Sequence, residues 1–130
     1  MKSNTAVLIS KSLLDAILEN AKILHPKETI LLLRGKRQKN LIKISELIVP
    51  PLATYGQGFA TIPTHMLPID FSIVGTAHSH PSGNLKPSPT DLNHFWGNIL
   101  MIVSFPFANE TNVAVYNREG ERLTLKITRA

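Results

Sequence analysis

The sequence predicts a single α/β domain over residues 1–130, and two patterns favour this fold class. Apolar runs of strand length recur between turn-forming residues, while one segment places its apolar residues at helical spacing. The length suits one domain with one core, and 43% hydrophobic against 18% charged residues is a globular composition. Because no repeat or linker divides the chain, we expect these elements to share one core.

The first elements are expected to be a strand, a helix and a second strand. Residues 5–9 are typical of a short strand, and Ser10 then stands where a helix N-cap belongs. Apolar residues recur every three or four positions over residues 11–24, which predicts an amphipathic helix that Pro26 ends. The continuous apolar run at 29–35 is typical of a strand covered on both faces.

The middle of the chain has a less regular pattern. A polar turn at 35–40 leads into a strand at 41–51, which its two final prolines end. Residues 51–70 contain glycines and prolines without a clear period, so we expect a loop with room for one short element. Residues 71–80 are apolar until their last positions and predict a strand.

The last third of the chain predicts a helix, a strand and a hairpin. The helix is expected over residues 88–96, and residues 98–105 form an apolar run typical of a buried strand. Residues 113–127 alternate on both sides of Gly120, which predicts a closing β-hairpin.

Composition limits the function classes. The chain has no cysteine, which excludes disulfides and thiolate metal sites and leaves His, Asp and Glu as metal ligands. No apolar run is long enough to span a bilayer and no basic-then-apolar leader is visible, so we expect a soluble cytoplasmic protein without a membrane partner.

The net charge is +5, and basic residues cluster between the second and third predicted strands. Such a cluster attracts anionic partners, but it is equally typical of a solvated hairpin tip. No aromatic residue interleaves with it, so nucleic acid is not the expected partner, whereas an acidic protein surface stays open. The basic residues are Arg34, Lys36, Arg37, Lys39 and Lys43.

The segment HSHPSGNLKPSPTD, residues 78–91, concentrates the chemistry. Residues two apart in a strand point to the same side, so His78 and His80 present two imidazoles together. Ser88 meets the requirements of a helix N-cap, with a proline following it, and Asp91 falls in the first turn. Two histidines, one aspartate and an open position are typical of a hydrolytic zinc site.

Spacing alone leaves alternatives to this zinc site. Most histidines are surface or hydrogen-bonded residues, and Ser88 and Asp91 also fit a simple helix cap. His94 lies three residues after Asp91 on the same helical face and competes with it as third ligand.

The whole pattern, His-x-His, seven residues, Ser, two residues and Asp, resembles the signature of the JAMM (MPN+) metalloprotease family in its minimal prokaryotic or archaeal form. The segment PKETILLLRG, residues 26–35, is similar to the family's glutamate-bearing strand. The resemblance implies a mixed β-sheet flanked by helices in the three-layer, cytidine-deaminase-like architecture of that family. It also implies one Zn²⁺ bound by His78, His80 and Asp91, with Glu28 as general base and Ser88 stabilising the oxyanion.

The general base has two candidates on the residues alone. Glu46 shares the strand phase of its apolar neighbours and so can point inward, although a strand-end charge that reaches solvent is the simpler interpretation. Glu28 also has a simpler interpretation, as a solvent-exposed charge just before a strand. The family pattern favours Glu28.

The resemblance implies a peptidase or isopeptidase that cleaves after the C-terminus of ubiquitin or a ubiquitin-like modifier, with homodimerisation through strand edges as a further option. Removal of a single C-terminal residue from a carrier protein would use the same site. Two other classes stay open: a RadC-like protein associated with DNA repair, since HPSG also occurs in that group, and a non-catalytic MPN scaffold.

Overall fold

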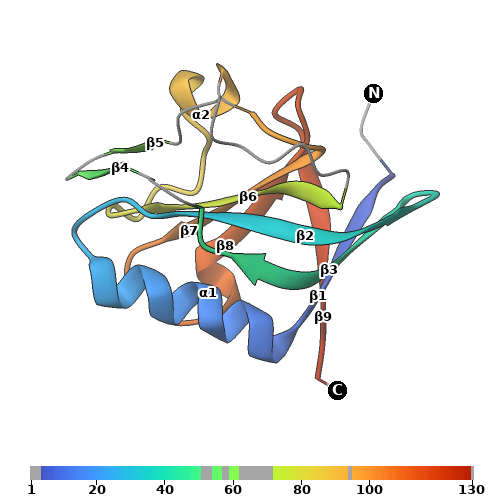
Figure 1. The fold of residues 1–130 in the computed structure, drawn as a ribbon, viewed down its shortest axis with the longest axis horizontal. Helices are drawn as coiled ribbons and strands as arrows, with labels where there is room; N and C mark the ends of the chain where they lie inside the picture. The colour runs from blue at the N-terminus through green and yellow to red at the C-terminus, as the bar shows by residue number, and fades with distance from the viewer. Residues whose placement is uncertain (1–3, 51–53, 57–58, 62–71, 94, 130) are drawn as a thin grey trace.

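The computed structural model describes residues 4–50, 54–56, 59–61, 72–93 and 95–129, and its chain path is drawn in Figure 1. Two helices, nine strands and one short 3-10 helix lie within this part of the chain. In chain order they are β1 (Ala6–Ser10), α1 (Lys11–Leu24), β2 (Ile30–Gln38), β3 (Leu41–Ile48), β4 (Thr54–Gly56), β5 (Phe59–Thr61), β6 (Ile73–His80), α2 (Pro89–Asn93), β7 (Ile99–Ser104), the 3-10 helix Glu110–Asn112, β8 (Val113–Tyr116) and β9 (Arg122–Thr128).

Seven strands form one mixed sheet in the order β1-β3-β2-β6-β7-β8-β9, and β9 pairs back with β1 so that the sheet closes on itself. The pairs β1–β3, β1–β9 and β6–β7 are parallel, and the other four are antiparallel. The predicted mixed sheet is therefore confirmed. The closure of the sheet on itself was not predicted, because no local sequence pattern indicates it.

Helix α1 covers one face of the sheet. Ser10 caps it through a hydrogen bond from the Leu13 N–H to the Ser10 Oγ of 3.2 Å, as the sequence predicts. Its apolar stripe packs into a core that includes residues of β2, β6 and β7. The buried residues of α1 are Leu14, Ile17, Leu18 and Ala21.

The opposite face is covered by the chain that follows β6. A smaller core of Leu100, Ile102, Ala114 and Tyr116 lies there, with Leu85, Leu92 and Phe95 packed against it. Figure 1 shows α1 and α2 on opposite sides of the sheet, which gives the expected three layers. Between them β6 and β7 are buried along their whole length.

Several boundaries differ from the sequence prediction, and strand β3 ends at Ile48, before the predicted limit at 51. Helix α2 ends at Asn93, so it is shorter than the predicted 88–96. Strand β2 continues to Gln38 and forms a long hairpin with β3 that projects away from the rest of the sheet in Figure 1. Within the predicted loop 51–70, β4 and β5 pair as a separate two-stranded sheet, and the remaining residues lie outside the described part of the chain.

Candidate metal centre

Strand β6 brings His78 and His80 to one face of the sheet. His78 lies opposite Ile30 of β2 and Ile102 of β7, so it shares the face of the smaller core, away from α1. The two histidines are 6% and 9% exposed and Asp91 is 7% exposed, which is unusual for residues of these types. Buried polar groups of this kind need specific partners.

The loop after β6 orients His80. The Nδ1 atom of His80 lies 2.9 Å from the backbone oxygen of Asn84, and because a carbonyl only accepts, Nδ1 carries a proton. This contact leaves Nε2 as the ring atom that faces Asp91. The loop is held in place by a hydrogen bond of 2.7 Å from the Tyr116 hydroxyl to the Leu85 oxygen.

The first turn of α2 positions Asp91. The Asp91 N–H donates to the Ser88 Oγ at 3.0 Å, and the Ser88 N–H donates to the Asp91 Oδ2 at 2.8 Å. This reciprocal pair is a capping box, with aspartate in the place usually taken by glutamate. It fixes the Asp91 carboxylate with both oxygens directed at the histidines.

The three side chains converge. The Nε2 of His80 lies 3.1 Å from the Oδ2 of Asp91, and the Nδ1 of His78 lies 3.7 Å from its Oδ1. Burial alone would raise the pKa of Asp91, but hydrogen bonds from His80 and the Ser88 N–H, with the charges of both histidines, lower that pKa to about 2. Asp91 is therefore a carboxylate at neutral pH.

The same contacts act on His80 in the opposite sense. Burial works to lower its pKa, yet the hydrogen bonds to Asp91 and Asn84 and the charges of Asp91 and Glu28 outweigh burial and raise the pKa. When His80 is protonated, its Nε2 carries a proton. A metal ion that binds Nε2 must displace that proton, which links metal binding to pH.

Glu28 enters the site from the segment between α1 and β2. It is half-buried, and burial raises the pKa of its carboxyl, an effect that the charge of His80 opposes and the charge of Asp91 reinforces. The charges of both residues thus act on the Glu28 carboxyl.

Glu46 lies elsewhere. Its side chain is 55% exposed and forms an ion pair of 2.6 Å with Arg34. The strand alternation that was expected to point Glu46 inward is interrupted by a β-bulge. Arg34 pairs with Glu46 and Gly35 pairs with Ile44, so Ser45 is an extra residue between them.

The donor set fits a zinc ion. Two imidazoles and one carboxylate from two adjacent segments are the ligand types zinc takes in hydrolytic sites, and the second ring nitrogen of His80 has the hydrogen-bonded oxygen such ligands usually have. Among the described residues no three His, Asp or Glu side chains are already spaced as a metal-binding cluster; Asp91 hydrogen-bonds directly to His80 instead. His94, the competing ligand, lies outside the described residues.

Sequence reasoning missed Ser79, Asn84 and Tyr116. Asn84 and Tyr116 hold the loop that closes over His80. Ser79 is 1% exposed and hydrogen-bonds to Thr29, next to Glu28. The signal for Ser79 was available, because a serine flanked by two site residues in an otherwise apolar strand needs a polar partner.

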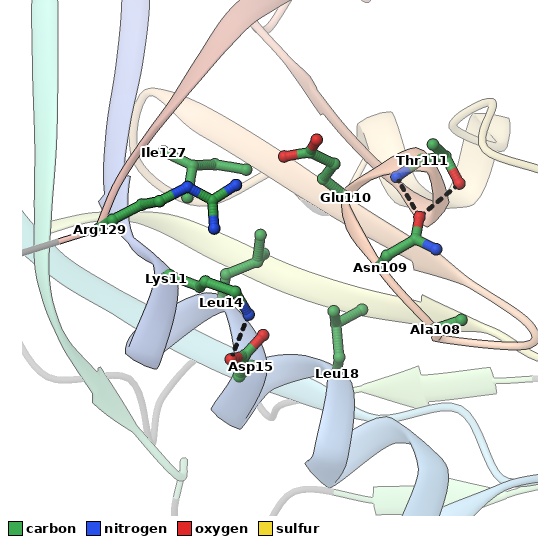
Figure 2. A pocket seen from close by; sticks show the side chains of 10 residues that line it. All are labelled: Lys11, Leu14, Asp15, Leu18, Ala108, Asn109, Glu110, Thr111, Ile127 and Arg129. Atoms are coloured by element: carbon green, nitrogen blue, oxygen red, sulfur yellow. Dashed lines mark hydrogen bonds and ion pairs between the residues drawn. The ribbon is translucent and has the colours of Figure 1, made fainter.

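A hollow of about 370 Å³ on the α1 side contains none of these residues (Figure 2). It lies between α1, the loop around Asn109 and the end of the chain. Its lysine is already paired, since Lys11 forms an ion pair of 2.8 Å with Asp15. The candidate centre is therefore separate from this hollow.

Comparison with known proteins agrees with the site. The family of prokaryotic homologs of the JAB domain matches residues 10–119. A probable metalloprotease from Haloferax volcanii is 31% identical over 127 residues, which cover 92% of this chain and 78% of the relative.

Three solved structures share the fold. One, described as a JAMM metalloprotease-like zinc site in the proteasome and signalosome, is 36% identical with a TM-score of 0.68 over 95% of this chain and 98% of that chain. A JAB1/MPN domain protein from Archaeoglobus fulgidus is 33% identical with a TM-score of 0.67, over 93% and 95%. A protein from Desulfitobacterium hafniense shares the fold alone, at 14% identity and a TM-score of 0.69 over 95% and 94%. The chain therefore belongs to the prokaryotic branch of the JAMM/MPN family, and its similarity to a probable metalloprotease supports a metal-dependent hydrolase.

Proposed function

We propose that this protein is a zinc peptidase that cleaves the bond after the C-terminal tail of a ubiquitin-like modifier, either an isopeptide or a linear peptide bond. The observation that carries the proposal is the convergence of His78 and His80 on the Asp91 carboxylate, with Glu28 in electrostatic reach. A binding scaffold has no need of this buried, polar arrangement.

In this proposal His78, His80 and Asp91 hold the zinc ion. The bound ion would supply Lewis-acid chemistry, polarising a scissile carbonyl and making a water molecule more acidic. Glu28 takes a proton from the attacking water and returns it to the leaving amine. A carboxyl whose pKa is raised by burial suits this transfer, because its proton affinity is closer to that of the groups it serves.

The role of Ser88 concerns the carbonyl oxygen of the scissile bond. Its Oγ already accepts a hydrogen bond from the Asp91 N–H, which fixes the position of the oxygen and leaves the hydroxyl proton to be donated. Donation to the developing oxyanion of the tetrahedral intermediate is the role that we assign to it.

The substrate is expected to bind as an extended strand. Within the described residues the seven-stranded sheet is closed, so its strands are already paired, whereas the β4–β5 hairpin has free edges. In Figure 1 this hairpin lies at the same end of the molecule as the last residues of β6. Its edge can pair with a modifier tail by β-augmentation.

Exposed apolar residues support a protein substrate. Ile23 lies in the last turn of α1, Val49 follows β3 and Phe105 follows β7, and their exposed fractions are 71%, 67% and 47%. Strands β3, β6 and β7 run in the same direction, so Val49 and Phe105 lie at the end of the sheet where β6 ends at His80. These residues offer contacts to the folded part of a modifier.

The basic cluster gives less support to a nucleic-acid partner. Two of its five residues are already engaged, Arg34 with Glu46 and Arg37 with the Asn98 side chain at 2.6 Å. The cluster lies on the β2–β3 hairpin, whose tip is at the opposite end of the molecule from the metal centre (Figure 1).

The test uses zinc-loaded protein and a ubiquitin-fold protein that ends in Gly-Gly, supplied with a C-terminal peptide extension or with an isopeptide-linked lysine peptide. Mass spectrometry should show release after the terminal glycine. Glu28→Gln should keep its zinc and lose about 10²–10⁴-fold in rate, while the matched control Glu46→Gln stays active. Zinc-loaded protein that cleaves neither substrate but binds duplex DNA would favour the RadC-like class.

A further inference from the structure

Ser79 stands between the two histidines, but its side chain points to the other face of the sheet. Successive strand residues alternate, so Ser79 follows Ala77 into the core beneath α1, where it is 1% exposed. A hydroxyl in such surroundings needs a hydrogen-bond partner. Its partner determines what the residue does.

That partner is the backbone of Thr29. The Thr29 N–H donates to the Ser79 Oγ at 2.7 Å, and the Ser79 N–H donates to the Thr29 oxygen at 3.1 Å. The regular β2–β6 ladder starts one residue later, where Ile30 pairs with His78. Ser79 therefore extends the pairing by one residue and uses its side chain for the second bond.

The Thr29 N–H belongs to the peptide group that joins Glu28 to Thr29. Holding this group fixes the direction in which the Glu28 backbone leaves the sheet. The charges of His80 and Asp91 act on the pKa of the Glu28 carboxyl. Strand β6 thus presents His78 and His80 on one face and Ser79, which binds the backbone next to Glu28, on the other.

We propose that Ser79 is a positioning residue that sets Glu28 relative to His80 and Asp91. The inference rests on the proposed role of Glu28 as general base. Because the Ser79 hydroxyl hydrogen-bonds to the Thr29 backbone and not to a histidine, its loss should change the placement of the base and leave both histidines in place.

The experiment compares Ser79→Ala with Ser79→Thr, which keeps the oxygen, and with Thr29→Val, which removes a neighbouring hydroxyl but keeps the Thr29 N–H. For Ser79→Ala we expect unchanged zinc content, an unchanged KM, a loss of kcat of about 10²-fold from a displaced base, and faster hydrogen exchange of the Thr29 amide. Ser79→Thr should restore kcat, and Thr29→Val should behave as wild type. If Ser79→Ala fails to fold, Ser79→Cys, a weaker acceptor, replaces it.

The outcomes distinguish the positioning role of Ser79 from the proposed peptidase function. Full kcat in Ser79→Ala, unchanged exchange of the Thr29 amide, or loss of zinc would each overturn the positioning role while the peptidase proposal stands. Full activity in Glu28→Gln would overturn the base assignment and the positioning role with it. Because exchange and zinc content are measured without substrate, they test the hydrogen bond even when no substrate is cleaved.

Discussion

The Nε2 atom of His80 lies 3.1 Å from the Oδ2 of Asp91, although the two residues are eleven positions apart and belong to a strand and a helix. The Ser88–Asp91 capping box and the Asn84 contact of His80 hold the two ends of this pair. The pair is the centre of the candidate site, and its chemistry can be tested one group at a time.

Asp91→Asn is expected to abolish stoichiometric zinc binding, because the amide is a much weaker zinc ligand than a carboxylate whose pKa lies near 2. Metal analysis of purified protein checks this. Asp15→Asn is the matched control, since Asp15 is an exposed carboxylate paired with Lys11 on α1. Zinc retained in Asp91→Asn and lost in His94→Ala would transfer the ligand role to His94.

Ser88→Ala should weaken both the helix start and the reaction. The Asp91 N–H loses its acceptor, at a cost of about 0.5–2 kcal/mol of stability, as for other N-caps. Denaturant unfolding measures the stability, and steady-state kinetics measures kcat. Ser88→Thr keeps the hydroxyl and should restore both; a Ser88→Ala protein with lowered stability and full kcat would limit Ser88 to capping.

The pKa of Glu28 should respond to its neighbours with opposite signs. In metal-free protein this pKa is raised above its usual value, chiefly through burial. Asp91→Asn removes a negative charge and should lower the pKa of Glu28, whereas His80→Gln removes a positive charge and should raise it. A ¹³C NMR titration of the carboxyl follows both; no response to either variant would place Glu28 away from the site.

Gly75→Ala should destabilise the strand that carries both histidines. A Cβ on Gly75 would collide with the backbone oxygen of Ile99 on β7, and backbone cannot move aside as a flexible side chain can. We expect a loss of about 1–3 kcal/mol, typical of overpacking, in a thermal or denaturant melt. Gly83→Ala is the control, because its Cβ would meet only the Phe105 oxygen at 3.9 Å.

Local patterns predicted most of the elements. The helical stripe and the Ser10 cap predicted α1 with the observed limits, and the apolar runs predicted β2, β6 and β7. The closure of the sheet was not predictable, because the β1–β9 pairing joins the two ends of the chain and leaves no local signal. The β-bulge at Ser45 likewise depends on pairing with β2.

The site residues likewise divide into those that local sequence patterns placed and one that they did not. His78 and His80 were placed on one face by strand alternation, and Ser88 and Asp91 by helix-capping chemistry. The approach of Glu28 could not be read from spacing, since it depends on the antiparallel pairing of β2 with β6 fifty residues later. On the residues alone Glu28 and Glu46 were both candidates, and only the family pattern favoured Glu28.

The most direct test of zinc binding by His78, His80 and Asp91 is X-ray diffraction from crystals of zinc-loaded protein, with data collected on both sides of the zinc absorption edge. We expect one anomalous peak per chain, bonded to His78, His80 and Asp91 and adjacent to Glu28. A peak bonded to other side chains, or to His94 in place of Asp91, would contradict this assignment.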